Sequence, residues 1–390
     1  MSDPLQAITA LIHHAYQPPD VWDAVPPGVY KASTIIFPNV AALRARSWKS
    51  KAGYTYGLHG TPTTFTLEER IATLEGGSYC TLAPSGLAAI VMVNIGLLKS
   101  GDELLLPANV YGPSKELART LLADWGITHR LYDPMDGASL AAALTDRTRL
   151  VWLEAPGSVT MEFPDLIGLI AAARSRGVLT ALDNTWGAGL ALRPFDLGVD
   201  VVMQALTKYP SGGADVLMGS VVTRDQALHH RVVQAHMRLG IGVAANDAEA
   251  VLRGLPSMGV RYRAQDAAAR DLALWLQGQR RVARVLHPAL PGSPGHAHWA
   301  RTCTAAAGLF SVLIDPALTS TQVDAFVDAL RLFKLGYSWA GPVSLVVPYD
   351  LDSMRADRSG LPGHLVRFSI GLEDVSDLRA DLAQALQRLA

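Results

Sequence analysis

The stretch Val199–Gly213, VDVVMQALTKYPSGG, combines an apolar strand with a lysine placed where that strand should end. All but one of the residues from Val201 to Leu206 are apolar, and glycines follow the lysine. A lone lysine is ordinarily a surface residue whose stem covers apolar neighbours while its amine stays in water. An amine in this setting is instead largely desolvated, which favours its neutral, nucleophilic form. Lys208 is therefore a candidate for covalent chemistry.

Strands and helices alternate on both sides of this stretch. Strands are predicted at residues 78–84, 102–108, 128–133, 148–156, 178–184, 199–208 and 216–223, and helices at 85–101, 113–126, 139–144 and 165–177. Strands that alternate with helices of this length form a mostly parallel sheet with helices on both faces. The apolar run Val151–Leu153 agrees with a strand that is buried on both sides. The sequence therefore predicts an α/β fold with a mostly parallel central sheet.

The pattern changes at both ends of this region. Residues 1–60 are rich in proline, aromatic and polar residues without sustained periodicity, and they are interpreted as an arm. Beyond residue 256 a long helical stretch at 260–279 precedes isolated strands at 308–315, 343–348 and 366–371 and helices at 319–331 and 376–389. We therefore predict an N-terminal arm at 1–60, an α/β domain at 61–256 and a smaller α+β domain at 257–390.

Composition narrows the classes of function. Of the 390 residues 49% are hydrophobic and 18% charged, which permits a large core, and the formal net charge is −1. No basic stripe is present, so nucleic acid and anionic membranes are not expected as partners. Cys80 and Cys303 fit no metal-ligand spacing, so no metal is expected. The sequence also has no signal peptide and no long apolar run, which favours a cytoplasmic protein.

Residues at the predicted strand ends can bind a ligand, because ligands of open α/β sheets lie at the carboxyl ends of the strands. Ser85-Gly86-Leu87 follows the first strand and opens a helix, whose free N–H groups favour phosphate. A simple capping serine is the competing interpretation. Asp183 ends an apolar strand and is either a turn aspartate or the partner of a cation. The glycine patterns of dinucleotide and nucleoside-triphosphate sites are missing from the sequence.

Together the helix start, Asp183 and Lys208 match the needs of pyridoxal 5′-phosphate (PLP). The helix start anchors the phosphate, the lysine forms a Schiff base, and the carboxylate keeps the pyridine nitrogen protonated. This combination is far more specific than any of its members. The sequence therefore predicts a PLP enzyme.

Several longer motifs resemble the Cys/Met-metabolism family of PLP-dependent enzymes. These motifs are LDNTWGAG (182–189), QALTKYPSGGADVLMGS (204–220), LEAPGSVTMEFPD (153–165), GYSWAGPVSLVVP (336–348) and VRFSIGLEDVSDL (366–378). The similarity extends from Tyr54 to the last helix. PGSVTME and GYSWAG favour the bacterial cystathionine β-lyase branch over the γ-lyases and the γ-synthase. The resemblance implies the aspartate aminotransferase type of fold, fold type I, with its smaller C-terminal α+β domain.

The resemblance also implies how the cofactor is bound. Lys208 matches the Schiff-base lysine, and Asp183 matches the partner of the pyridine nitrogen. Tyr111, in NVYGPS, matches the tyrosine that stacks on the cofactor ring. The phosphate cradle is implied to consist of Ser85, Gly86, Leu87 and Thr207.

The resemblance assigns the substrate and the partner subunit in the same way. Arg367 matches the arginine that binds the substrate α-carboxylate, a natural bidentate task for a guanidinium. Ser338 lies where backbone contacts hold that arginine and the substrate, and Trp339 is implied to wall the pocket. Tyr56 matches a tyrosine that reaches into a neighbouring subunit's site. A homo-oligomer with shared sites, a dimer of dimers, is therefore expected.

Two departures from the family pattern stand out. The family commonly has an arginine after Tyr-Gly near the end of the arm, where it contacts the cofactor phosphate of the partner subunit, and here Leu58 replaces it. His59 and Thr61 are the nearby candidates for compensation. A histidine is also common after the lysine, and here Gly213 to Asp215 read Gly-Ala-Asp.

The implied reaction is α,β-elimination of L-cystathionine to homocysteine, pyruvate and ammonia, within transsulfuration and methionine biosynthesis. Lys208 takes the α-proton, and Lys208, Tyr111 or Tyr56 protonates the leaving sulfur. A cysteine desulfhydrase-like β-lyase and a cystathionine γ-lyase are the alternatives within the family. A non-catalytic regulatory protein on the same scaffold is the alternative of another class, and the intact Lys208, Asp183 and Arg367 argue against it.

Overall fold

A seven-stranded sheet forms the centre of the larger part of the computed structural model, which describes residues 24–354 and 361–389. Its strands, in spatial order, are β1 (Tyr79–Ala83), β7 (Gly219–Thr223), β6 (Val201–Gln204), β5 (Leu179–Asp183), β4 (Thr148–Glu154), β2 (Glu103–Pro107) and β3 (Thr128–Tyr132). Only β7 runs antiparallel to its neighbours, β1 and β6. The other pairs are parallel, which confirms the predicted mostly parallel sheet.

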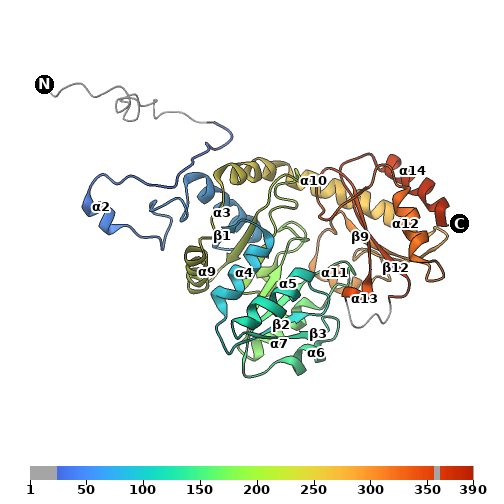
Figure 1. Ribbon diagram of the computed structural model, residues 1–390, viewed down its shortest axis with the longest axis horizontal. Coiled ribbons are helices and arrows are strands. Elements are labelled where there is room, and N and C mark those ends of the chain that lie inside the picture. Colours follow the sequence, from blue (N-terminus) through green and yellow to red (C-terminus); the bar gives the residue numbers. More distant parts are fainter. Residues whose placement is uncertain (1–23, 355–360, 390) are drawn as a thin grey trace.

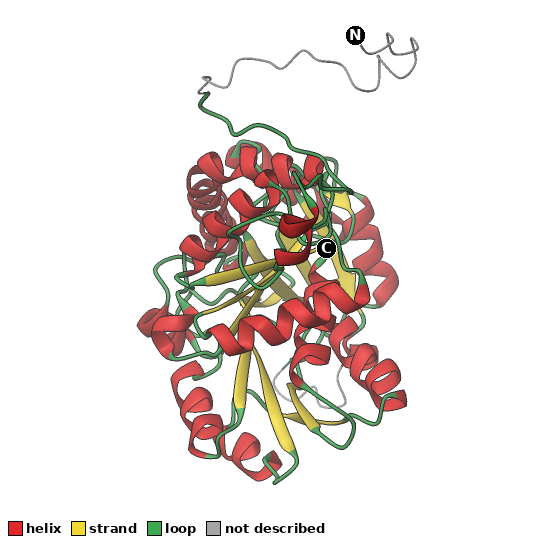
Figure 2. Cartoon of the chain, turned by 90° about the vertical axis from the view of Figure 1, so that its left-hand side faces the viewer, coloured by secondary structure: helices red, strands yellow, loops and turns green. Residues whose placement is uncertain are grey.

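Successive residues of the central strands point to opposite faces of this sheet. On β2, Leu104 and Leu106 join one apolar core while Leu105 joins the other. A strand buried on both faces needs apolar residues at every position, which explains the unbroken runs in the sequence. Helices lie on both sides of the strands (Figure 2).

The helices around the large sheet divide between its two faces. They are α3 (Pro62–Glu75), α4 (Gly86–Leu97), α5 (Gly112–Leu117), the π-helical turn η1 (Ala118–Leu122), α6 (Gly137–Ala143), α7 (Leu166–Ser175), α8 (Pro194–Leu197) and α9 (Gln226–Leu239). Residues of α3 and α7 belong to one core, and residues of α4, α5 and α9 to the other. The sheet is thus the middle layer of three, as expected for an α/β fold.

The C-terminal part has its own five-stranded sheet in the order β10-β11-β12-β9-β8. The strands are β8 (Val282–Leu286), β9 (Leu309–Ile314), β10 (Lys334–Leu335), β11 (Leu345–Tyr349) and β12 (His364–Ser369). Its helices are α11 (His296–Thr302), α12 (Ser320–Asp328), α13 (Leu351–Met354), α14 (Val375–Leu386) and the short η2 (Gln387–Leu389). All pairings except β10 with β11 are antiparallel, and a separate apolar core packs beneath them. The architecture agrees with the predicted smaller α+β region of a fold type I enzyme.

A single long helix, α10 (Ala245–Gln277), connects the two sheets (Figure 1). The predicted helix at 260–279 is its second half, and Pro256 lies inside it. The predicted domain boundary at 256 therefore falls within a continuous helix, and where the domains divide stays a prediction. The described part of the arm includes α2 (Val40–Ala45) and extends away from the sheets in Figure 1, while residues 1–23 lie outside the described structure.

Two differences from the predicted elements have physical causes. The helix predicted at 113–126 passes from α5 into the π-helical turn η1, a local widening that residue propensity does not reveal. Helix α9 was not predicted, because His229, His230 and His236 interrupt its apolar positions. Among the described residues, no helix is long and apolar enough to cross a bilayer.

Candidate active site

Three chemically active side chains meet at the carboxyl edge of the large sheet. Asp183 ends β5 and pairs in register with Glu154, which ends β4. Strand β6 lies on the other side of β5 and ends at Gln204, and a turn closed by Lys208 N–H to Ala205 O at 3.1 Å follows it. The sheet topology thus brings Asp183 and Lys208 together although 25 residues separate them in the sequence.

The amine of Lys208 is desolvated and, among the described residues, has Ser338 as its hydrogen-bond partner. Its Nζ donates to Ser338 Oγ at 2.7 Å and lies 5.6 Å from the centre of the Trp339 ring. Burial, helped by the charge of Arg367 and opposed by Asp183, lowers the pKa of Lys208 to about 8. The amine is therefore readily available in its neutral, nucleophilic form near physiological pH.

Asp183 presents one free carboxylate oxygen. The backbone N–H and the hydroxyl of Thr185 both donate to Oδ1, and Oδ2 accepts no hydrogen bond from the described residues. Burial raises the pKa of Asp183, and the Thr185 bonds and the charge of Lys208 oppose the rise. A partly buried carboxylate with an unused oxygen suits a cationic N–H partner, which would return its pKa to a lower value.

The start of α4 lies against the turn that carries Lys208. Ser85 is the N-cap, and its Oγ accepts the N–H of Ala88 at 3.0 Å. A Cβ on Gly86 would lie 2.8 Å from Ala205 Cβ, so only glycine permits this approach. Leu87 is partly exposed at the same helix end. The helix dipole and the free N–H groups here favour an anion.

Thr207 lies beside this helix start but has a structural bond of its own. Its hydroxyl accepts the N–H of Met218 at 3.0 Å and donates to Met218 O at 3.2 Å. The turn after the lysine is closed by Gly212 N–H to Lys208 O at 2.9 Å, with Gly212 at a φ of 67°. Glycine is favoured at that φ, which explains the glycine in the sequence motif.

Ser338 joins the lysine to the arginine. Its Oγ accepts from Lys208, and its carbonyl accepts from Arg367 Nη2 at 3.2 Å. Ser338 has a φ of 93°, a costly conformation for a serine that the two contacts help to explain. Arg367, only 8% exposed, comes from β12 of the small sheet, so the site lies between the two sheets.

Tyr111 is the N-cap residue of α5 and stands beside the two strand-end carboxyls. Its backbone N–H donates to Glu154 Oε2 at 2.8 Å. Burial and the charge of Asp183 raise the pKa of Glu154 well above its usual range, and burial and both carboxylates raise the pKa of Tyr111. Tyr111 is 42% exposed, so its side chain is accessible to a ligand.

The arm residues lie apart from this cluster within one chain. Tyr56 is 51% exposed, and in the described structure no interaction joins its side chain to Lys208. The two candidates for compensating Leu58 are engaged elsewhere: the Thr61 hydroxyl caps α3, and His59 packs edge-on against Phe65 with ring centres 5.3 Å apart. The described residues of one chain thus do not bring Tyr56 into contact with Lys208.

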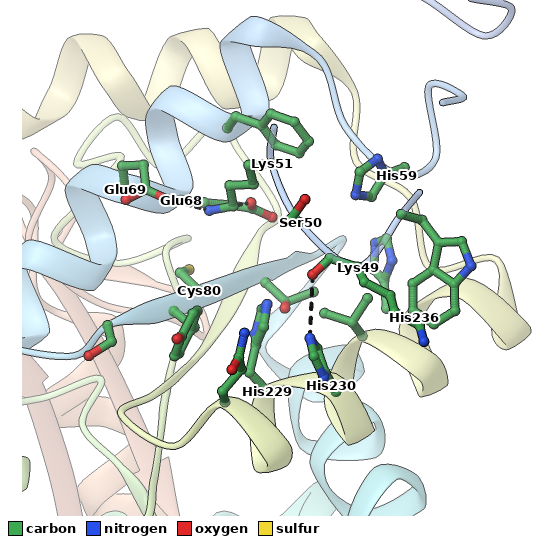
Figure 3. A pocket seen from close by; sticks show the side chains of 17 residues that line it. Lys49, Ser50, Lys51, His59, Glu68, Glu69, Cys80, His229, His230 and His236 are labelled. Atoms are coloured by element: carbon green, nitrogen blue, oxygen red, sulfur yellow. Dashed lines mark hydrogen bonds and ion pairs between the residues drawn. The ribbon is translucent and has the colours of Figure 1, made fainter. Parts of the chain in front are cut away.

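A separate cavity of about 320 Å³ lies under the arm, and its lining includes none of the residues of the Lys208 cluster (Figure 3). Lys51 enters it from the arm and binds Glu68 at 2.9 Å and Glu69 at 2.6 Å. The Lys49 carbonyl lies 3.3 Å from His230 Nε2 on α9. The cavity therefore marks where the arm is fastened to α3 and α9. No group of three metal-ligating side chains occurs among the described residues.

The residues at the sheet edge fit PLP. A desolvated amine, a carboxylate with an oxygen that the described residues leave unused, and a helix start that favours an anion meet there. Each complements a different part of the cofactor. Fold and site together define a PLP-dependent enzyme of fold type I.

Comparison with known proteins assigns the family. The chain belongs to the Cys/Met metabolism PLP-dependent enzymes, whose pattern matches residues 8–387. It is 40% identical to the cystathionine beta-lyase of Bordetella avium, covering 92% of this chain and 91% of that protein. It is 36% identical to the cystathionine beta-lyase of Escherichia coli K12, covering 93% of each. The structure of cystathionine gamma synthase from Xanthomonas oryzae pv. oryzae with aminoacrylate and cysteine superposes with a TM-score of 0.87, at 33% identity over 99% of this chain and 98% of that one. The protein is a PLP-dependent carbon–sulfur lyase.

Sequence reasoning missed two residues at the site. Glu154 ends its strand as Asp183 does, so a carboxylate at the end of a buried strand was an available signal. Tyr349, whose ring lies against Arg367, had none, because its position is set by strand pairing in the small sheet.

Proposed function

We propose that this enzyme catalyses α,β-elimination of L-cystathionine. One water is consumed, and the products are homocysteine, pyruvate and ammonia. The observation that carries the proposal is the bridge through Ser338, which binds the amine of Lys208 and the guanidinium of Arg367 at once. This bridge fixes the proton carrier relative to the group proposed to bind the substrate carboxylate.

The proposed roles of the residues follow from this geometry. Arg367 binds the α-carboxylate and so orients the α-carbon toward Lys208. Asp183 would keep the ring nitrogen of PLP protonated, and the cofactor would then supply an electron sink for the α-carbon. Lys208 Nζ removes the α-proton, and its pKa of about 8 suits a group that alternates between base and acid near pH 7.

The remaining groups of the site are proposed to hold the cofactor and to complete the elimination. Ser85, Gly86, Leu87 and Thr207 would hold the cofactor phosphate, and Tyr111 would hold the cofactor ring. Lys208, Tyr111 and, from a second subunit, Tyr56 are the candidate donors of the proton to the leaving sulfur. Trp339 walls the pocket beside the amine, where it excludes water.

The site is also proposed to be completed by oligomerisation. Tyr56 lies on an arm that is fastened under α3 and α9 and does not reach the Lys208 cluster of its own chain. A homo-oligomer, a dimer of dimers, in which the arm reaches a neighbouring site accounts for this exposed tyrosine. A cytoplasmic role in transsulfuration and methionine biosynthesis is proposed with it.

Product analysis tests the reaction. PLP-loaded protein is incubated with L-cystathionine, and the oxo acid and the thiol are identified. Equal amounts of pyruvate and homocysteine are expected. 2-Oxobutyrate with cysteine would instead identify a γ-lyase, an alternative kept open by the similarity to a cystathionine gamma synthase. Sulfide released from cysteine, without cystathionine turnover, would identify a cysteine desulfhydrase-like β-lyase.

A further inference from the structure

Arg367 is a buried cation whose protein contacts are few. Its Nη2 donates to Ser338 O, while its Nε is buried and has no hydrogen-bond partner among the described residues. No carboxylate of the described residues forms an ion pair with Arg367. Removing a guanidinium from water without such compensation is costly, so another interaction must hold it in place.

Tyr349 supplies this interaction, because its hydroxyl accepts a hydrogen bond from the Arg367 side chain and its ring lies against the guanidinium. The guanidinium carbon of Arg367 lies 5.2 Å from the ring centre, within the range of a cation–π contact. The pairing of β11 with β12 explains the approach. Val347 lies opposite Arg367, and Tyr349, two residues further, therefore points to the same face as a diagonal neighbour.

Tyr349 also packs against a second tyrosine. The ring of Tyr337 meets it at 69° with centres 6.4 Å apart, an edge-to-face arrangement. Tyr337 directly precedes Ser338, so the loop that binds the guanidinium also supports the ring that stacks on it. The tyrosine is only partly buried and remains at the edge of the site.

We propose that Tyr349 is the positioning residue of Arg367. Its ring and hydroxyl restrain the guanidinium in the orientation in which the remaining N–H groups meet the α-carboxylate of an amino-acid substrate. The inference rests on the carboxylate-binding role of Arg367 in the proposed function. It predicts that loss of the ring weakens recognition of the carboxylate and leaves recognition of the amine intact.

Two probes separate carboxylate from amine recognition. Glycine and methylamine both exchange with Lys208 on the bound cofactor and change its visible absorption, but only glycine has a carboxylate. For Tyr349→Leu we expect glycine to bind roughly tenfold more weakly and methylamine to bind within about twofold of the parent. Tyr349→Phe keeps the aromatic face but loses the hydroxyl bond to Arg367. It should weaken glycine binding less than Tyr349→Leu does and leave methylamine binding within about twofold of the parent.

A double-mutant cycle tests whether Tyr349 acts through the arginine. In an Arg367→Leu background, Tyr349→Leu should not weaken glycine binding further, because the group that it positions is gone. Tyr349→Met fills a similar volume without an aromatic face and replaces the leucine variant if that variant does not fold.

Each contrary result is distinct. Unchanged glycine affinity in Tyr349→Leu would overturn the inference, and so would an equal weakening of glycine and methylamine. If Tyr349→Phe lost as much as Tyr349→Leu, the hydroxyl and not the ring would be responsible. Should cystathionine not be turned over while glycine binding still depends on Tyr349, the proposed reaction fails and the inference stands.

Discussion

Two partly buried lysines in this protein have opposite properties. Burial lowers the pKa of Lys208 to about 8, because desolvation and the charge of Arg367 outweigh the nearby carboxylate of Asp183. Burial also acts on Lys51, but Glu68 and Glu69 bind its amine and raise the pKa above the ordinary value of 10.5. The amine of Lys208 instead has a neutral partner, the hydroxyl of Ser338.

The comparison shows that burial does not by itself make a lysine reactive. The sign of the pKa change depends on whether a carboxylate is bound to the amine. A lysine held by carboxylates is a permanent cation and serves as an anchor. A lysine held by a hydroxyl beside an arginine is a potential nucleophile. Chemistry and arm attachment thus use the same residue type in different electrostatic surroundings.

Replacing the reactive lysine should have the largest effect. Lys208→Ala should lower kcat for cystathionine by at least about 10³-fold, because the proton carrier and the covalent anchor of the cofactor are both lost. The rate of pyruvate formation and the visible absorption of the bound cofactor measure this. Lys51→Met is the matched control and should keep the cofactor's absorption. If Lys208→Ala turned over cystathionine at a near-normal rate, Lys208 would not be the reactive lysine.

Replacing the anchoring lysine should act on stability. Lys51→Met leaves the buried Glu68 without its cation, which should lower the free energy of unfolding by about 1–3 kcal/mol. Urea unfolding at a fixed protein concentration measures this change in the free energy of unfolding. The folded-state pKa of Lys51 is raised, so its contribution is complete below pH 10.5 and is lost as the pH rises through the folded-state value.

A neighbouring carboxylate provides the control for this stability effect. Glu69 binds the same amine but is 63% exposed, so Glu69→Gln should cost less than about 0.5 kcal/mol. If both variants lose the same stability, the partner that matters is not the buried carboxylate.

The sequence was more informative about Lys208 than about Lys51. The strand period, the strand-end positions and the family motifs all converge on the edge of the large sheet, so Lys208, Asp183 and the start of α4 were predictable. Lys51 belongs to an arm without periodicity, and its partners on α3 become neighbours only through tertiary packing. Tyr349 was hidden for the same reason, since only the register of β11 with β12 places it at Arg367.

The pH dependence of cofactor uptake should show the lowered pKa directly. The ammonium form of Lys208 cannot attack an aldehyde, so the rate at which cofactor-free protein takes up PLP should rise with pH. With a pKa of about 8, the rise between pH 7 and pH 9 should be about tenfold and then level off. With a lysine of ordinary pKa, the uptake rate would still rise above pH 9.

Arg367→Leu gives the matching variant for this measurement. Removal of the nearby cation should move the levelling-off to higher pH, because Arg367 is one cause of the lowered pKa. If the PLP uptake rate of the parent protein kept rising beyond pH 9, the pKa of Lys208 would not be lowered. The electrostatic contrast with Lys51 would then be wrong.

The smallest effect is expected where the arm departs from its family. Leu58→Arg places a cation seven residues after Lys51. In the proposed oligomer we expect it to tighten PLP binding roughly fivefold, through a charge-assisted hydrogen bond to the cofactor phosphate of the neighbouring subunit. Leu58→Met is the uncharged control, and the gain should shrink at high salt. In a Lys51→Met background the gain should fall as well, because an arm that is not fastened at α3 cannot hold its end in a defined place. If Leu58→Arg tightens PLP binding equally with and without Lys51, then Lys51 does not influence the cofactor site through the arm. It would then stabilise only its own subunit.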